Sequence, residues 1–190
     1  MKRRTLRVAV GVLAFGLSAC GAHVDHHSAS IRHSPGTEAT IVVFPMKLPE
    51  KVKLGAGAEQ TLGNLYATEL LKIYEILDYD RFVTLLEERK LSPENVFEEE
   101  TGRRLHEELG LDGVLVSQVY EWEPGTPGIL FLAKKGRLGF QARLVDLQSG
   151  SVIWSVNQAI RTEPDDSLSV AVSRLCQVLV QEMPRSLAPY

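Results

Sequence analysis

The residues with the clearest potential for metal chemistry are four histidines near the N-terminus. His23, His26, His27 and His33 fall within residues 21–38, a stretch rich in Ser and Gly that lacks apolar periodicity. Imidazoles at this density can bind zinc or copper. A flexible segment, however, gives them neither a fixed geometry nor partners that orient the rings. We therefore predict solvated histidines and no metal site, with metal binding as the alternative.

Three acidic clusters could supply paired carboxylates for acid–base catalysis. They lie at residues 87–88, 98–100 and 107–108, on or beside predicted helices. Catalytic carboxylate pairs need burial to separate their pKa values, whereas charge runs of this kind are usually solvated helix faces. The Gly-rich residues 55–63 precede a helix but miss the spacing of the dinucleotide-binding fingerprint. Since the sequence also lacks hydrolase, zinc-protease, CxxC and P-loop motifs, we predict a non-catalytic protein without a cofactor.

Cys20 and Cys176 are the two cysteines of the chain, and their surroundings differ. A basic head at residues 2–7 and an apolar run at residues 8–17 precede Cys20. The apolar run is too short to cross a bilayer core of about 30 Å. Together with the basic head it is typical of a secretory signal peptide. Cys176 lies in an apolar helical stretch, so a buried thiol is expected rather than a reactive one.

The four residues that end at Cys20, LSAC, resemble a bacterial lipobox. The resemblance implies a lipoprotein signal peptide over residues 1–19, cleavage before Cys20, and covalent lipid on the Cys20 thiol and amine. Several acyl chains hold a protein firmly on a membrane, because each buried methylene contributes about 0.8 kcal/mol. Gly21, in place of Asp at the second mature position, implies the outer membrane. The alternative is an ordinary signal peptide with an incidental cysteine.

Charge and length limit what the rest of the chain can be. The leader holds four of the 21 basic residues, so 17 remain against 24 acidic ones. An acidic balance argues against nucleic-acid binding, which needs clustered Lys and Arg. We expect residues 20–38 to form a lipidated N-terminus and flexible tether, and residues 39–190 to form one domain.

The apolar patterns predict alternating strands and helices. The run at residues 39–45 is apolar on both faces, as in a strand covered on two sides, residues 112–124 are rich in β-branched side chains, and other segments show helical or two-residue periodicity. The predicted elements are a strand at 39–45, a helix at 59–77, a strand turning into a helix at 81–91, a helix ending at Gly110, a strand at 112–124, a hairpin at 137–160 and a helix at 165–183. This order, β-α-β-α-α-β-β-β-α, predicts an α/β single domain with a mixed β-sheet flanked by helices.

The junction LGLDGVLVSQV and the hairpin RLVDLQSGSVIWS, in this order after a lipobox, resemble a known periplasmic family. The family includes CsgG of curli secretion, PelC of exopolysaccharide export and the N-terminal domain of TolB, and LpoB has a related fold. The similarity covers about residues 39–183. The resemblance implies a ring at the outer membrane, which in CsgG is completed by two long hairpins per subunit. Here only residues 123–136 could form an insertion, which is too short for membrane-crossing hairpins and favours a PelC-like collar under a separate channel.

Two apolar features could form contact surfaces. Ile129, Leu130, Phe131 and Leu132 lie between Pro/Gly turns and two lysines, so they could contact lipid, a neighbouring subunit or the core. Trp154 could lie at a membrane interface, but it alternates with valines in a predicted strand, which indicates core packing as the other reading.

The sequence and the resemblance together predict an outer-membrane lipoprotein on the periplasmic face. We expect a homo-oligomeric ring or collar that serves an outer-membrane channel or envelope machine during export of a polysaccharide or protein polymer. The alternatives are a monomeric LpoB-like activator of a cell-wall synthase and an accessory ring protein of a flagellar or pilus motor. A tether of 18 flexible residues averages only about 20–25 Å, which favours the ring over a long-reaching activator.

Overall fold

The computed structural model describes residues 25–28, 39–52, 54–128 and 133–184. The strands are β1 (Asp25–Ser28), β2 (Thr40–Val43), β3 (Glu75–Leu77), β4 (Gly113–Glu123), β5 (Gly136–Asp146) and β6 (Val152–Thr162). The helices are α1 (Ala58–Leu70), α2 (Tyr79–Glu88), the 3-10 helix η1 (Pro93–Phe97), α3 (Glu99–Leu109) and α4 (Leu168–Leu179).

The strands form one mixed sheet in the order β1-β6-β5-β4-β2-β3. β2 pairs in parallel with β3 and β4, while β4, β5 and β6 pair antiparallel as a long meander. From β2 onward the order of strands and α-helices is the predicted one, so the fold class is confirmed. The parallel pairs require crossover connections, which α1 and the α2–α3 region provide.

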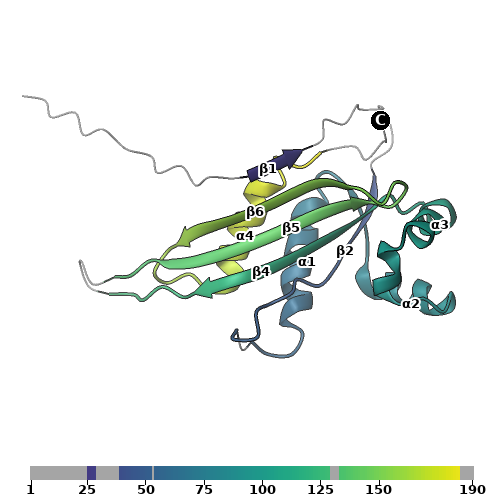
Figure 1. Cartoon of the computed structure of the whole chain (residues 1–190). Helices are drawn as coiled ribbons and strands as arrows, with labels where there is room; N and C mark the ends of the chain where they lie inside the picture. Colours follow the sequence, from purple (N-terminus) through teal and green to yellow (C-terminus); the bar gives the residue numbers. More distant parts are fainter. Residues whose placement is uncertain (1–24, 29–38, 53, 129–132, 185–190) are drawn as a thin grey trace, which may run out of the picture.

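One face of the sheet is covered by α1 and α4, which lie behind the long strands in Figure 1. Trp154, Phe140 and Leu115 point from three strands into this layer, and Tyr66 and Cys176 meet them from the helices. All five side chains are buried. The apolar rows of the strands and the apolar faces of the helices therefore pack together in one layer, which is the main core of the domain.

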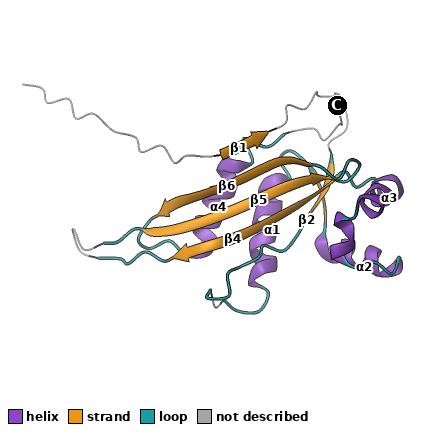
Figure 2. Cartoon of the chain, in the orientation of Figure 1, coloured by secondary structure: helices purple, strands orange, loops and turns teal. Residues whose placement is uncertain are grey.

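The opposite face is covered at one end only. Figure 2 shows α2 and α3 grouped beside that end of the long strands. Phe82 and Leu86 of α2 and Leu105 of α3 pack on Val42 and Val114 in a second, smaller core. Because these helices lie over β2 and the start of β4, the remaining lengths of β4, β5 and β6 have a second face without helical cover (Figure 1).

Two predicted boundaries were wrong. The helix predicted at 59–77 ends at Leu70, and its last residues form the edge strand β3 instead. The strand predicted at the start of 81–91 is the helix α2, because the Asp78 side chain accepts a hydrogen bond from the Arg81 amide (3.0 Å) and caps a helix there. Apolar periodicity identified the buried residues correctly, but it could not locate the residues at which one element ends and the next begins.

Part of the expected tether is a strand. β1 pairs antiparallel with β6, with Asp25 opposite Asn157 and Ser28 opposite Trp154. An edge strand is bound by main-chain hydrogen bonds, so it needs no apolar alternation and leaves no signal of that kind in the sequence. The domain boundary predicted at residue 39 therefore excluded a segment that belongs to the sheet. Among the described residues, no helix is long and apolar enough to span a membrane.

Candidate contact surfaces of the long strands

The face of β4, β5 and β6 turned away from α1 and α4 is rich in polar and charged side chains. Each strand has 11 residues and is therefore about 35 Å long. The register places one row of alternate residues from each strand on this face, which we call the open face. Its members include Gln118, Glu121, Arg137, Gly139, Gln141, Arg143, Ser155, Asn157, Ala159 and Arg161.

A bulge places an aromatic ring on the open face. The register of β4 shifts between Val119 and Glu121, which leaves Tyr120 outside the regular alternation. Its hydroxyl donates a hydrogen bond to the Gln158 carbonyl (3.2 Å), and its ring lies against Gly139, where a Cβ atom would be 2.8 Å from Tyr120 Cζ. The ring thus covers β5 at Gly139, and Tyr120 is 40% exposed. Partly exposed aromatic residues are typical of contact surfaces.

A groove of about 600 Å³ runs between the open face and η1. Phe44, Phe97 and Val152 supply much of its apolar lining, and Phe44 packs edge-on against Phe97 with ring centroids 5.7 Å apart. Phe97 is 48% and Val152 51% exposed. Glu94 and Arg143 line the same groove, so its rim carries both signs of charge.

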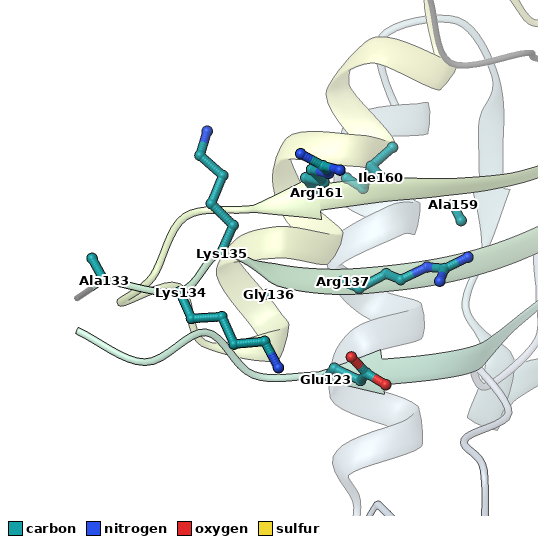
Figure 3. A pocket seen from close by; sticks show the side chains of 9 residues that line it. All are labelled: Glu123, Ala133, Lys134, Lys135, Gly136, Arg137, Ala159, Ile160 and Arg161. Carbon is teal, nitrogen blue, oxygen red and sulfur yellow. The ribbon is translucent and has the colours of Figure 1, made fainter. Parts of the chain in front are cut away.

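The other end of the long strands is basic. A hollow of about 680 Å³ is lined by the cations Lys134, Lys135, Arg137 and Arg161 together with Glu123 (Figure 3). Lys135 pairs with Glu163 (3.4 Å) and Arg137 pairs with Glu121 (3.1 Å). Within the described part of the chain, Lys134 and Arg161 have no ion-pair partner. Figure 3 shows the two lysines extending to opposite sides of the strand end.

Glycines allow the strand ends to meet at this hollow. A Cβ atom on Gly136 would lie 2.6 Å from the Glu123 carbonyl oxygen, and one on Gly125 would lie 2.8 Å from the Lys134 carbonyl oxygen. Thr126 and Lys134 are joined by two main-chain hydrogen bonds of 2.8 and 2.9 Å. The strand pairing of β4 and β5 therefore continues beyond Gly136 toward the connecting segment.

The charges of the chain are separated along the molecule. Residues 78–112, which contain α2, η1 and α3, carry eleven acidic and five basic side chains. Residues 113–162, which contain β4, β5 and β6, carry three acidic and five basic ones. In Figure 1, α2 and α3 lie at one end of the long strands. The residues that line the basic hollow belong to the other end, where β5 begins and β6 ends. The strands therefore form a basic region, although the net charge of the whole chain is negative.

The structure distinguishes the contact residues that the sequence suggested. Trp154 is 1% exposed and lies in the main core, so of its two predicted roles the structure shows core packing and not a surface contact. The alternation of β6 determined that Trp154 shares a face with Val156, but it could not show which face of the sheet the helices cover. Cys20, Ile129, Leu130, Phe131 and Leu132 lie outside the described residues. The sequence analysis did not single out Arg143 and Arg161, although their alternation with buried residues was an available signal. It also missed Tyr120, which the bulge takes out of the alternation.

Cys176 is a buried thiol, as expected. Burial raises its pKa well above the usual range, and Glu69 raises it further, so the reactive thiolate is disfavoured. Residues 98–100 and 107–108 are exposed, as solvated helix faces are. Among the described residues, no group of three His, Cys, Asp or Glu side chains is placed to hold a metal ion.

Solved structures share this fold. PelC from Paraburkholderia phytofirmans, solved as a dodecamer, has a TM-score of 0.53 and 15% identity, and the match covers 84% of this chain and 95% of PelC. A point variant of that dodecamer gives 0.54 at the same identity, with 84% and 96% covered. Lipoprotein GNA1162 from Neisseria meningitidis gives 0.48 at 22% identity, with 76% and 96% covered. No family model matches the sequence, and no curated protein matches it.

These identities establish a common fold with PelC and nothing finer. The GNA1162 score is below 0.5, so the fold assignment depends on PelC. The predicted resemblance is thereby confirmed at the level of the PelC fold, and the resemblance to CsgG and TolB stays a prediction.

Proposed function

We propose that this chain is a non-catalytic subunit of a periplasmic ring or collar, lipid-anchored to the outer membrane through Cys20. The observation that supports it best is the open face of β4, β5 and β6. This face displays Arg143, Arg161 and Tyr120. The end of the molecule that contains α2 and α3 is acidic. A surface of this size that no part of the described chain covers is suited to a partner.

Charge separation favours a second copy of the chain as that partner. The acidic helices α2 and α3 of one copy are complementary to the basic strands of the next. Such a contact is head-to-tail, because different surfaces of the two copies meet. Head-to-tail contacts form a closed ring when the rotation between copies closes, and an open filament when it does not. The dodecamer of PelC provides a precedent for closure in this fold.

The role of such a ring would be geometric. Lipids on Cys20 hold the ring against the membrane, and the subunits leave an axial passage for an exported polysaccharide or protein polymer. The partner would be a separate outer-membrane channel, because the strand end at residues 123–136 is too short to build a barrel. The subunit would need neither a cofactor nor a metal.

A double charge reversal tests the proposed contact. Arg143→Glu with Arg161→Glu places two carboxylates on the open face, where both side chains are exposed. We expect this variant to sediment as a monomer in analytical ultracentrifugation, while the parent chain sediments as a ring. The matched control is Lys51→Glu with Lys72→Glu, which changes the charge equally away from the open face. An unchanged ring in the first variant would contradict the proposal.

A further inference from the structure

β1 is attached to the rest of the domain along one edge of the sheet. It pairs antiparallel with β6 over four residues, with Asp25 opposite Asn157 and Ser28 opposite Trp154. Since β1 is the last strand of the sheet order, no described strand lies on its other side. Figure 1 shows β1 along this edge beside β6. A strand of four residues that is paired on one side only belongs to the least stable part of a sheet.

The sheet order places β1 far from β2, the next strand along the chain. β6, β5 and β4 lie between them, so the two strands are about four spacings of 4.8 Å apart across the sheet. The register also places Asp25 level with Gln118 of β4. Thr40 of β2 instead accepts a hydrogen bond from the Asp112 amide (2.8 Å), six residues earlier on that chain. The two offsets together separate Asp25 from Thr40 by about 28 Å.

The pairing of β1 determines how far the domain can lie from a lipid on Cys20. Five residue steps separate Cys20 from Asp25, so their Cα atoms are at most about 18 Å apart while β1 is paired. Twenty steps separate Cys20 from Thr40, so the limit becomes about 70 Å once β1 leaves β6. The number of residues sets both limits, whatever their conformation. Because β1 is the first described element after Cys20, a pull on Cys20 acts on β1 before it acts on the core.

We propose that β1 is a releasable strap that gives the lipid tether two lengths. Paired with β6, the strap holds the domain close to the membrane. Released, it lets the domain move away from the membrane without leaving it, while the other strands keep their order and partners, since β1 pairs with β6 alone. The inference rests on the proposed lipid anchor and goes beyond it, because it assigns a mechanical role to one strand of the sheet.

Stretching single molecules measures release of the strap directly. The chain from residue 20 onward, with Cys20→Ser and a peptide tag at each end, is pulled in magnetic tweezers. Release of β1 frees the 15 residue steps between Asp25 and Thr40, which extend to about 50 Å but span only about 28 Å in the fold. We therefore expect a first, reversible lengthening of about 20–25 Å at a force below the one that unfolds the domain.

A disulfide across the strap provides a reversible lock. His27 lies opposite Ser155, and opposite Cα atoms of antiparallel strands are about 4.5–5.5 Å apart, a separation that a disulfide can bridge. When oxidised, the variant His27→Cys with Ser155→Cys should lose the first lengthening, and reduction should restore it. The matched control, Asp25→Cys with Ser155→Cys, is two residues out of register and should keep the lengthening under the same oxidant. Cys176 is buried and does not compete for the new thiols.

Three results would overturn the proposal: a parent chain that unfolds in a single event, a first lengthening that persists in the oxidised lock, or one that survives His26→Pro with His27→Pro. Of two consecutive residues in an edge strand, one directs its N–H toward the neighbouring strand, so the two prolines remove a pairing amide. The measurement needs no lipid. Failure of the lipid anchor, which the mass of the N-terminal peptide from native membranes detects, would therefore not be mistaken for failure of the strap.

Discussion

Gly125 and Gly136 lie at the basic end of the long strands, where neighbouring main chain approaches both glycines closely. The main chain of Glu123 and Lys134 occupies the space that a side chain on either glycine would need. Nothing in the sequence distinguishes these two glycines from Gly55, around which a Cβ atom would find open space. Single-residue patterns identified the buried thiol of Cys176, but steric requirements of this kind depend on the tertiary approach of strands.

Gly136→Ala should therefore destabilise the domain. The added methyl group would lie 2.6 Å from the Glu123 carbonyl oxygen, and main-chain atoms cannot rotate out of its way. We expect a loss of about 1–3 kcal/mol in the free energy of unfolding, as for other overpacked sites. Urea denaturation measures it, with Gly55→Ala as the matched control. Equal stability of the two variants would show that the strand ends are not closely packed.

Two buried tyrosine hydroxyl groups should make the protein less stable at alkaline pH. Burial raises the pKa of Tyr66 and Tyr74, and the Tyr74 hydroxyl donates a hydrogen bond to the Pro184 carbonyl. In the unfolded chain tyrosine ionises near pH 10, so above that pH the unfolded state binds fewer protons than the folded state. Their contribution is complete below about pH 9 and is lost as pH rises through the folded pKa values.

The measurement is the free energy of unfolding between pH 8 and pH 11, taken from urea denaturation at about half-unit intervals. Tyr74→Phe removes one ionising group and should flatten the decline. A decline of the same slope in the variant would mean that Tyr74 ionises freely in the folded protein.

At the scale of elements, the order of strands and helices could be read from apolar periodicity because each element buries one face or stripe. The long hairpin of β5 and β6 gave the clearest pattern and was correctly predicted. The end of α1 at Leu70 could not be found, since Tyr74 continues its apolar stripe after the helix has ended. β1 was also missed, because its pairing with β6 uses the main chain.

Charge complementarity between elements predicts a rescue experiment. Glu100→Lys with Glu107→Lys reverses two exposed carboxylates of α3, and we expect this change alone to weaken the ring. Combined in one chain with Arg143→Glu and Arg161→Glu, it restores opposite charges on the two surfaces that meet. The combined variant should recover part of the oligomer in analytical ultracentrifugation. If each pair weakens the ring and the combination weakens it further, α3 does not face the open face.

At the scale of the whole molecule, the fold has an acidic end, an open polar face and a basic strand end. In the proposed ring, the acidic end of one copy would contact the open face of the next. The sequence could indicate a member of this fold with an anchor. The sequence also shows the charge difference between residues 78–112 and 113–162, but it could not indicate where these segments lie relative to each other, because that depends on the folded sheet.

The assembly state of the lipidated protein tests this account most directly. Native mass spectrometry of the protein, extracted from membranes in mild detergent, measures the number of copies per particle. If the chain forms the proposed ring, we expect a closed oligomer with a single number of subunits, each carrying acyl chains on Cys20. A lipidated monomer at every concentration would contradict it, and would instead support a regulatory lipoprotein that acts on a separate enzyme.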